Sequence, residues 1–123
     1  MTPQELASEL ASFDGSENLY HRATPILIYY TDGIKWLQEN LNCYWLLDLI
    51  ASYQTDEFKA ANDRQFWKLV VADNSAIITC DDGNRNISVT QSIEYTDFPL
   101  SSVKIWVEIQ EQGRVFIYLP SEY

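Results

Sequence analysis

The stretch YWLLDLIASY, residues 44–53, is apolar on nearly every side of a helical turn. A helix of that composition is buried on most of its surface, so the stretch predicts the central helix of the fold. Asp48 interrupts it, and a buried carboxylate must be paired, hydrogen-bonded or protonated. We interpret Asp48 as a structural carboxylate bonded to a Tyr hydroxyl, a Trp indole or an Arg side chain. The alternative is a tuned acid in a pocket with Asp32 or Tyr53.

The helical pattern continues towards the N-terminus. Thr2 and Glu5 form a capping box with Pro3 between them, which predicts a helix start. A second helix is expected to begin at residues 31–33. Segment 17–25 is expected to be a loop that ends at Pro25. Residues 26–30 are expected to form either a strand or the approach to a helix. The apolar positions at helical spacing are Leu6, Leu10, Phe13, Ile34, Leu37 and Leu41.

Beyond the polar connection 55–65, the period of the apolar residues changes from helical to two. The clearest alternation lies in 87–95, after a hairpin signal at Asp82-Gly83. Helices followed by strands predict an α+β fold, and short connections predict an antiparallel meander of about five strands. We therefore expect one domain, 1–123, with N-terminal helices (1–55 mainly helical) packed on one face of the C-terminal sheet (66–119 mainly β).

The composition combines strong acidity with many aromatic residues. The chain has 18 Asp and Glu, 8 Lys and Arg, and a formal net charge of −10, together with four Trp, eight Tyr and five Phe. An apolar fraction of 46 % argues against disorder. The charge indicates either simple solubility or an anionic face that docks on a basic partner. Direct nucleic-acid binding is disfavoured because the basic residues are scattered.

Targeting signals also bear on the expected setting. Residues 1–6 have no basic region and no apolar run, which argues against a signal peptide. No stretch approaches the ~18 apolar residues of a membrane span. Cys43 and Cys80 are expected to be free thiols. We expect a cytoplasmic protein without a membrane partner.

The best surface candidate lies in the last two strands. If Val103, Ile105, Val115 and Ile117 face the helices, the aromatic residues between them face away. Exposed aromatic residues on an outer sheet face mark an interface, either with a protein partner or in a homodimer. The alternative is that loop 55–65 or 96–102 covers them. The residues of this candidate are Trp106, Phe116 and Tyr118.

Three further segments contain candidate residues. Asp97 and Phe98 lie in a loop that is either a binding loop or a corner anchored in the core. Asp81 and Asp82 resemble a calcium loop, but its twelfth position is not acidic, so a hairpin turn is the better explanation. The lone His21 is expected in an exposed loop. We predict no catalytic residue, no metal site and no cofactor.

Several motifs together resemble a family of small proteins of unknown function, found in bacteria, among them cyanobacteria, and on phages and plasmids. The resemblance covers nearly the whole chain and implies a mobile-element context, but no activity, cofactor or site residue. The motifs are YTDG (30–33), YWLLD (44–48) with IASYQ (50–54), WKL (67–69), TCDDGN (79–84), EYTDFPL (94–100) and LPSEY (119–123).

These observations predict a non-catalytic, acidic protein-interaction module rather than an enzyme. With the resemblance, they suggest a phage- or plasmid-borne inhibitor of a host defence or nucleic-acid-binding protein. The carboxylates and the exposed aromatic residues would meet a basic protein surface. The alternative is a small-ligand-binding protein or a small enzyme with a pocket near Asp32, Asp48 and Tyr53.

Overall fold

The structure is a computed structural model that describes residues 1–23 and 26–123. The predicted break at Pro25 lies outside these residues. The described helices are α1 (Pro3–Ser12), α2 (Asp32–Leu41), α3 (Tyr44–Ser52), α4 (Asp56–Ala61) and two short 3-10 turns, η1 (Glu111–Gly113) and η2 (Pro120–Glu122). The described strands are β1 (Leu19–Arg22), β2 (Ile28–Thr31), β3 (Arg64–Ala72), β4 (Ser75–Asp81), β5 (Ile87–Ile93), β6 (Ser102–Ile109) and β7 (Val115–Tyr118).

The α+β class and the N-terminal helices are confirmed, but the sheet differs from the prediction. Its described strands number seven rather than five, in the order β1-β2-β7-β6-β3-β4-β5. Only β3, β4 and β5 follow one another as a meander. Strand β6 returns to the free edge of β3 and pairs with it from Arg64↔Glu108 to Val70↔Ser102.

The crossing from β5 to β6 explains why the meander fails. The connecting segment is tied to the far end of the β3–β4 hairpin: Thr96 donates its backbone N–H to Asn74 O at 2.8 Å, and Val71 N–H donates to Ser101 O at 2.8 Å. Phe98 and Leu100 are buried in the core along the way. Burial of these two side chains carries the chain across the end of the hairpin, so a short connection does not imply adjacent strands here.

Two of the seven strands lie in the half predicted to be mainly helical. Segment 17–25, expected as a loop, contains β1, and residues 26–30 contribute to β2 rather than to a helix. Strand β2 pairs antiparallel with β1 and parallel with β7, where Ile28 lies opposite Val115. Because its second partner strand, β7, is at the other end of the chain, no local sequence pattern predicts this pairing.

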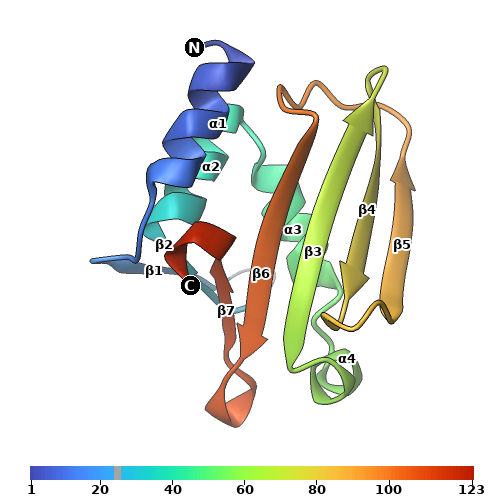
Figure 1. The fold of residues 1–123 in the computed structure, drawn as a ribbon. Helices are drawn as coiled ribbons and strands as arrows, with labels where there is room; N and C mark the ends of the chain where they lie inside the picture. The colour runs from blue at the N-terminus through green and yellow to red at the C-terminus, as the bar shows by residue number, and fades with distance from the viewer. Residues whose placement is uncertain (24–25) are drawn as a thin grey trace.

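Helix α3 covers one face of the central strands, whereas among the described residues the segment that reaches the opposite face is the short 3-10 turn η2. In Figure 1, α3 lies behind β6 and β3, and α2 lies behind α1 to the left of them. Helix α3 is central, as predicted: Leu46 and Ile50 are buried against Trp67, Leu69 and Ile105 of the sheet. We call the helix-covered side the inner face and the opposite side the outer face.

The prediction that Asp48 is buried is wrong, but the expected pairing with an Arg side chain is confirmed. Its side chain is 55 % exposed and forms an ion pair with Arg22 of β1, Oδ1 to NH1 at 3.0 Å. Tyr44, Asp48 and Ser52 are spaced four residues apart and are all exposed, so they form the solvent line of α3. The apolar residues occupy the rest of the helix circumference.

Two buried glutamines of the inner face, Gln54 and Gln65, bond to each other. Gln54 and Gln65 exchange two side-chain amide hydrogen bonds, at 2.7 and 2.8 Å, and Trp67 donates its indole N–H to Gln65 Oε1 at 2.9 Å. An unpaired buried amide would be costly, so this network fixes how α3 meets β3.

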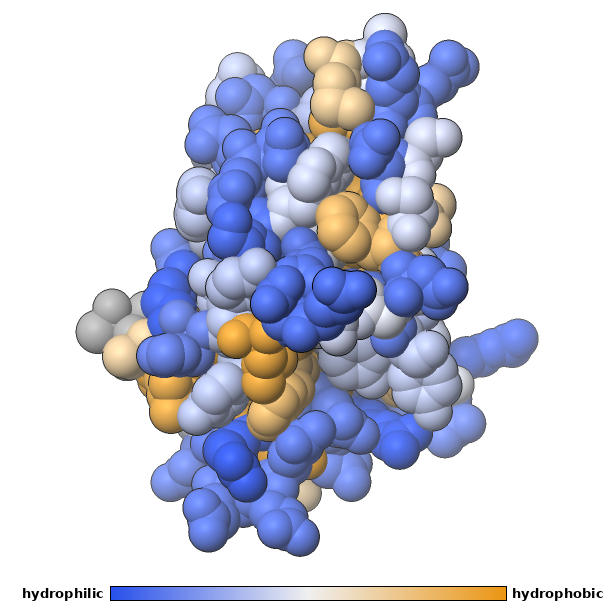
Figure 2. All heavy atoms as spheres, turned by 90° about the vertical axis from the view of Figure 1, so that its left-hand side faces the viewer, coloured by the Kyte–Doolittle hydropathy of each residue, from blue (hydrophilic) through white to orange (hydrophobic). Residues whose placement is uncertain are grey.

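The side on which α1 and β1 lie is mostly hydrophilic, with apolar residues only in separated patches (Figure 2). Among the described residues, no helix combines the length and the apolar character needed to cross a membrane.

Candidate functional site

The outer face carries a group of aromatic side chains because β3, β6 and β7 alternate. Along these strands, Trp67, Ile105 and Ile117 point to the helices and are buried, which sends their neighbours outwards. Strand pairing then places Phe66 opposite Trp106, and Trp106 opposite Tyr118. The structure thus orients Trp106, Phe116 and Tyr118 away from the helices, as the alternation predicts.

Four of these rings form what we call the aromatic cluster: Phe66, Trp106, Tyr118 and Tyr123. Trp106 is at its centre, with ring centroids 5.2 Å from Phe66, 6.2 Å from Tyr118 and 5.5 Å from Tyr123, all close to edge-to-face. Tyr118 and Tyr123 are nearly parallel at 6.3 Å. Beside the cluster, Tyr29 of β2 and Phe116 stack at 5.1 Å.

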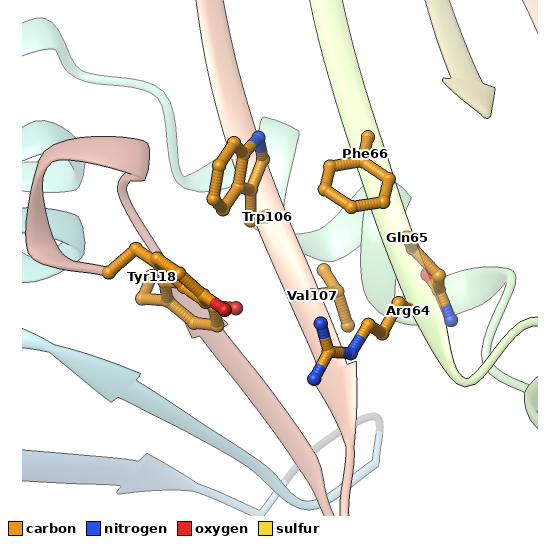
Figure 3. A pocket seen from close by; sticks show the side chains of 7 residues that line it. Arg64, Gln65, Phe66, Trp106, Val107 and Tyr118 are labelled. Carbon is orange, nitrogen blue, oxygen red and sulfur yellow. The ribbon is translucent and has the colours of Figure 1, made fainter. Parts of the chain in front are cut away.

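Two hollows open on either side of the Tyr118–Tyr123 pair. The first, which we call the Arg64 hollow, has a volume of about 210 Å³. Its lining comprises Arg64, Gln65, Phe66, Trp106, Val107, Tyr118 and Tyr123. The Arg64 side chain reaches from β3 across β6 towards Tyr118 (Figure 3). Rings and a guanidinium therefore surround this opening.

The second, which we call the Glu108 hollow, has a volume of about 250 Å³. Its lining comprises Thr31, Glu108, Phe116, Ile117, Tyr118, Glu122 and Tyr123. Two carboxylates and three aromatic rings meet here. Such a combination attracts an ammonium or a guanidinium group, through charge and through the ring faces.

Charges of both signs border the cluster. Arg64 NH2 lies 3.8 Å from Glu108 Oε1, and both side chains are partly exposed, which makes this a weak pair. Lys68 and Lys104 lie directly opposite each other on exposed positions of β3 and β6. Burial, together with the nearby Glu108 carboxylate, raises the pKa of Tyr118. Its hydroxyl therefore remains a hydrogen-bond donor at neutral pH.

The loops that were expected as covers do not reach the hollows. Among the described residues that line them, none comes from 96–102, and the two from 55–65, Arg64 and Gln65, belong to β3. The C-terminal turn η2 covers part of the cluster instead, because it places Tyr123 against Trp106. Tyr123 itself is 78 % exposed.

A clasp holds η2 in place and joins two of the sequence motifs. Glu122 Oε1 accepts hydrogen bonds from Thr31 Oγ1 at 2.6 Å and from Leu119 N at 3.0 Å, and its Oε2 accepts from Gly33 N at 3.1 Å. The carboxylate therefore caps the N-terminus of α2. A Cβ at Gly33 would lie 2.6 Å from Glu122 Oε1 and 2.6 Å from Leu119 Cδ1, so glycine is needed for this close approach.

The other predicted partner-binding residues lie away from the cluster. Phe98 is buried, so of its two readings the anchored corner is the right one and the exposed binding residue is wrong. Asp97 beside it is exposed. Their segment turns where the backbone N–H of Phe98 donates to Thr96 Oγ1 at 3.1 Å.

Asp81 and Asp82 direct their carboxylates into the hairpin turn. Asp81 Oδ1 accepts from Gly83 N at 2.7 Å, and Asp82 accepts from Asn84 N and from the Asn86 side chain, each at 2.8 Å. The hydrogen bonds to the Asp82 carboxylate lower its pKa, and the bond from the Asn86 side chain contributes most. Gly83 has φ +87°, a left-handed conformation that glycine adopts freely. The turn interpretation accounts for this segment.

The three residues of the alternative pocket have separate partners. Asp32 accepts from Glu17 N at 3.1 Å and from Asn18 N at 3.3 Å, which ties the chain after α1 to the start of α2. Burial acts to raise the pKa of Asp32, but hydrogen bonds led by that from Tyr20 lower it overall. Asp48 pairs with Arg22, and Tyr53 donates to Gln91 Oε1.

His21 and the two cysteine thiols are the remaining candidate reactive side chains. His21 lies in β1 rather than in a loop, and it is exposed beside Tyr29. Cys43 and Cys80 are free and buried. Within the described part of the chain, no three His, Cys, Asp or Glu side chains cluster as metal ligands would.

Sequence reasoning missed Phe66, Arg64, Glu108 and Tyr123. The sequence does contain a signal for Phe66 and Arg64. They and Lys68 occupy every second position of β3, so all three side chains point outwards. Glu108 likewise shares the alternation of Trp106. Tyr123 reaches the cluster only through the Glu122 clasp, which no local pattern reveals.

The chain belongs to a family of unknown function (DUF6876), whose match covers residues 4–123. This confirms the resemblance to a family of unknown function. No curated protein and no solved structure matches the chain.

Proposed function

We propose that this chain is a non-catalytic protein-interaction module that binds a protein partner through its outer face. The partner would place an apolar or aromatic side chain against the aromatic cluster and a Lys or Arg side chain in the Glu108 hollow. The observation that carries the proposal is the aromatic cluster itself, which lies on the outer face of the sheet and borders two open hollows.

The aromatic cluster has the composition of a binding hot spot. Trp, Tyr and Arg dominate such spots because they offer large rigid surfaces with a polar end. Trp106, Tyr118 and Arg64 are of these types and lie in mutual reach on three neighbouring strands. Phe66, Trp106 and Tyr118 are only half-buried on the outer face, which leaves part of an apolar patch open and supports a binding role.

The Glu108 hollow supports a basic side chain as the second contact. A Lys or Arg entering it would meet the Glu108 carboxylate and the rings of Phe116 and Tyr118. The net charge of −10 favours approach of a basic partner. The Arg64–Glu108 contact of 3.8 Å is weak enough to be exchanged for a contact with the partner.

The resemblance in sequence suggests a more specific role for this module. It would be a phage- or plasmid-borne inhibitor of a host defence or nucleic-acid-binding protein. The acidic surface and the basic second contact are compatible with it, because proteins that bind nucleic acids carry basic surfaces. A cytoplasmic location belongs to the same proposal. The alternative pocket has less support, because Asp32, Asp48 and Tyr53 are held by different partners.

The second contact can be tested with a matched pair of small probes. N-acetyl-arginine amide carries the guanidinium, and N-acetyl-citrulline amide is its neutral isostere. We expect the arginine probe to shift the NMR resonances of the Trp106 indole N–H and the Phe116 amide more than the citrulline probe does. Glu108→Gln should abolish that difference, whereas Glu9→Gln on α1 should leave it intact. Equal shifts from both probes would contradict the basic contact.

The protein partner can be tested by photo-crosslinking in cells. A benzoylphenylalanine in place of Phe116 lies on the outer face, and one in place of Tyr44 lies on the solvent side of α3. We expect a discrete protein adduct from position 116 that is absent from position 44 and lost with Trp106→Ala. Adducts of equal yield from both positions would refute the outer face as the binding surface.

A further inference from the structure

The outward positions of β3 and β6 place one aromatic ring between two charged side chains on each strand. On β3 the order is Arg64, Phe66, Lys68, and on β6 it is Glu108, Trp106, Lys104. Successive outward positions lie about 6.8 Å apart along a strand. The rings of Phe66, Trp106 and Tyr118 therefore form a narrow row that runs across the strands, with charged side chains along both of its sides on β3 and β6.

The shape of this row argues against two common ways of binding a peptide. An added β-strand needs a free sheet edge, but β3, β6 and β7 each have a strand on both sides. An amphipathic helix is about 10–12 Å across, so its apolar face would meet the charged side chains on both sides of the row. The row therefore suits a segment that is slimmer than a helix and does not pair as a strand.

A polyproline II segment has these properties. It has three residues per turn and no internal hydrogen bonds, so its backbone carbonyls accept bonds from a binding surface. Grooves lined by aromatic rings recognise such segments, because the rings pack on proline and the segment is already extended before binding. The ends of the Arg64 and Tyr118 side chains are directed to the same opening (Figure 3), and both carry hydrogen-bond donors.

The two hollows match one turn of such a segment. The Arg64 hollow lies over β3 and β6, and the Glu108 hollow lies over β7, between Glu108 of β6 and Thr31 of β2. Strands β3 and β7 are two strand spacings apart, about 9.6 Å, and one polyproline II turn advances about 9.3 Å. The volumes of about 210 and 250 Å³ lie below the range of about 300–1,000 Å³ for small-molecule pockets, so each hollow suits a single side chain.

We propose that the outer face binds a polyproline II segment of a protein partner, in which a proline and a Lys or Arg lie three positions apart. The proline occupies the Arg64 hollow against Phe66 and Trp106, and the basic side chain occupies the Glu108 hollow. Glu108 exchanges its weak contact with Arg64 for the incoming charge, and Arg64 donates to the carbonyls of the segment. This inference rests on the proposed function, because it names the kind of partner segment that the same surface binds.

Three acetylated and amidated heptapeptides test the segment. The first has a central arginine between two runs of three prolines, the second has citrulline in place of the arginine, and the third has alanine in place of every proline. We expect the first to shift the NMR resonances of the Trp106 indole N–H and the Tyr118 amide. Its dissociation constant should be at least about fivefold lower than those of the other two. Equal binding of the alanine peptide, or no binding of the first peptide up to about 5 mM, would overturn the proposal.

Substitutions assign the contacts to the two hollows. Tyr118→Phe removes only a hydroxyl, so it should keep the wild-type circular dichroism and weaken the first peptide by about two- to tenfold. Glu108→Gln should make the arginine and citrulline peptides bind equally. Val70→Ala is the control, because Val70 is an exposed position of β3 on the far side of Lys68, and it should change none of the three affinities. Unchanged affinities in both Tyr118→Phe and Glu108→Gln would also overturn the proposal.

The peptides and the photo-crosslink separate this inference from the proposed function. A partner adduct from position 116, together with no binding of the proline–arginine peptide, would keep the outer face as the binding surface and refute the polyproline II segment. Adducts of equal yield from positions 116 and 44, together with no peptide binding, would refute both.

Discussion

The inner and outer faces of the sheet come from the same strands and differ in what their side chains meet. Along β6, Val103, Ile105 and Val107 are buried under the helices, while Trp106 and Glu108, which alternate with them, border open hollows. On the inner face, the buried amides of Gln54 and Gln65 satisfy each other. The difference teaches that one face stabilises the fold and the other leaves its rings and charges available for a partner.

Replacing one tryptophan on each face gives the largest contrast. Trp67→Ala should lower the free energy of unfolding by about 3–5 kcal/mol, because it opens a cavity and removes a donor to Gln65. Trp106→Ala should cost at most about 1.5 kcal/mol, since it loses ring contacts at the surface. Urea denaturation of both variants measures the difference. Equal losses would mean that the outer face is part of the core.

The Glu122 clasp links the two faces and should have the next largest effect. Gly33→Ala should cost about 1–3 kcal/mol, because its Cβ would overlap Glu122 and Leu119. The same change should cost less in a Glu122→Ala background, which a double-mutant cycle measures. Glu122→Ala should also move the Trp106 indole resonance by releasing Tyr123. An unchanged Trp106 resonance would show that η2 holds its place without the clasp.

The buried thiol of Cys43 should make the free energy of unfolding depend on pH in the alkaline range. Burial raises the pKa of Cys43 from 9.0 to about 12. Between these values the unfolded chain releases the proton and the folded chain retains it. The free energy of unfolding therefore falls as pH rises through this window, by at most about 1.4 kcal/mol per pH unit. Cys43→Ala should show a shallower decline, and identical slopes would contradict the assignment.

The smallest expected effect concerns the charges of the outer face. Lys68 and Lys104 lie directly opposite each other, so Lys104→Glu should raise the free energy of unfolding by about 0.2–1 kcal/mol. Lys104→Gln removes the repulsion without adding an attraction and should give an intermediate value. Thermal unfolding at low and high salt measures both. A gain that persists in high salt would point to packing instead of charge.

The parts of the fold that depend on neighbouring residues were predictable. The Thr2–Glu5 capping box, the central helix at 44–53 and the outward direction of Trp106 all follow from local spacing, and the structure has each of them. The exposure of Asp48 was missed although a signal existed, because Tyr44, Asp48 and Ser52 mark the solvent line. The β2–β7 pairing was missed because its two segments are joined only by the rest of the fold.

The sequence by itself determined which side chains alternate and which residues form α1 and α3, since these depend on residues near in the chain, and it determined the net charge. Only the tertiary structure decided that β6 returns to β3 and that Glu122 caps α2. It also decided that Tyr123 closes the aromatic cluster beside Trp106. The physical reason is that burial of Phe98 and capping of a distant helix act between residues far apart in the chain, and no local period encodes them.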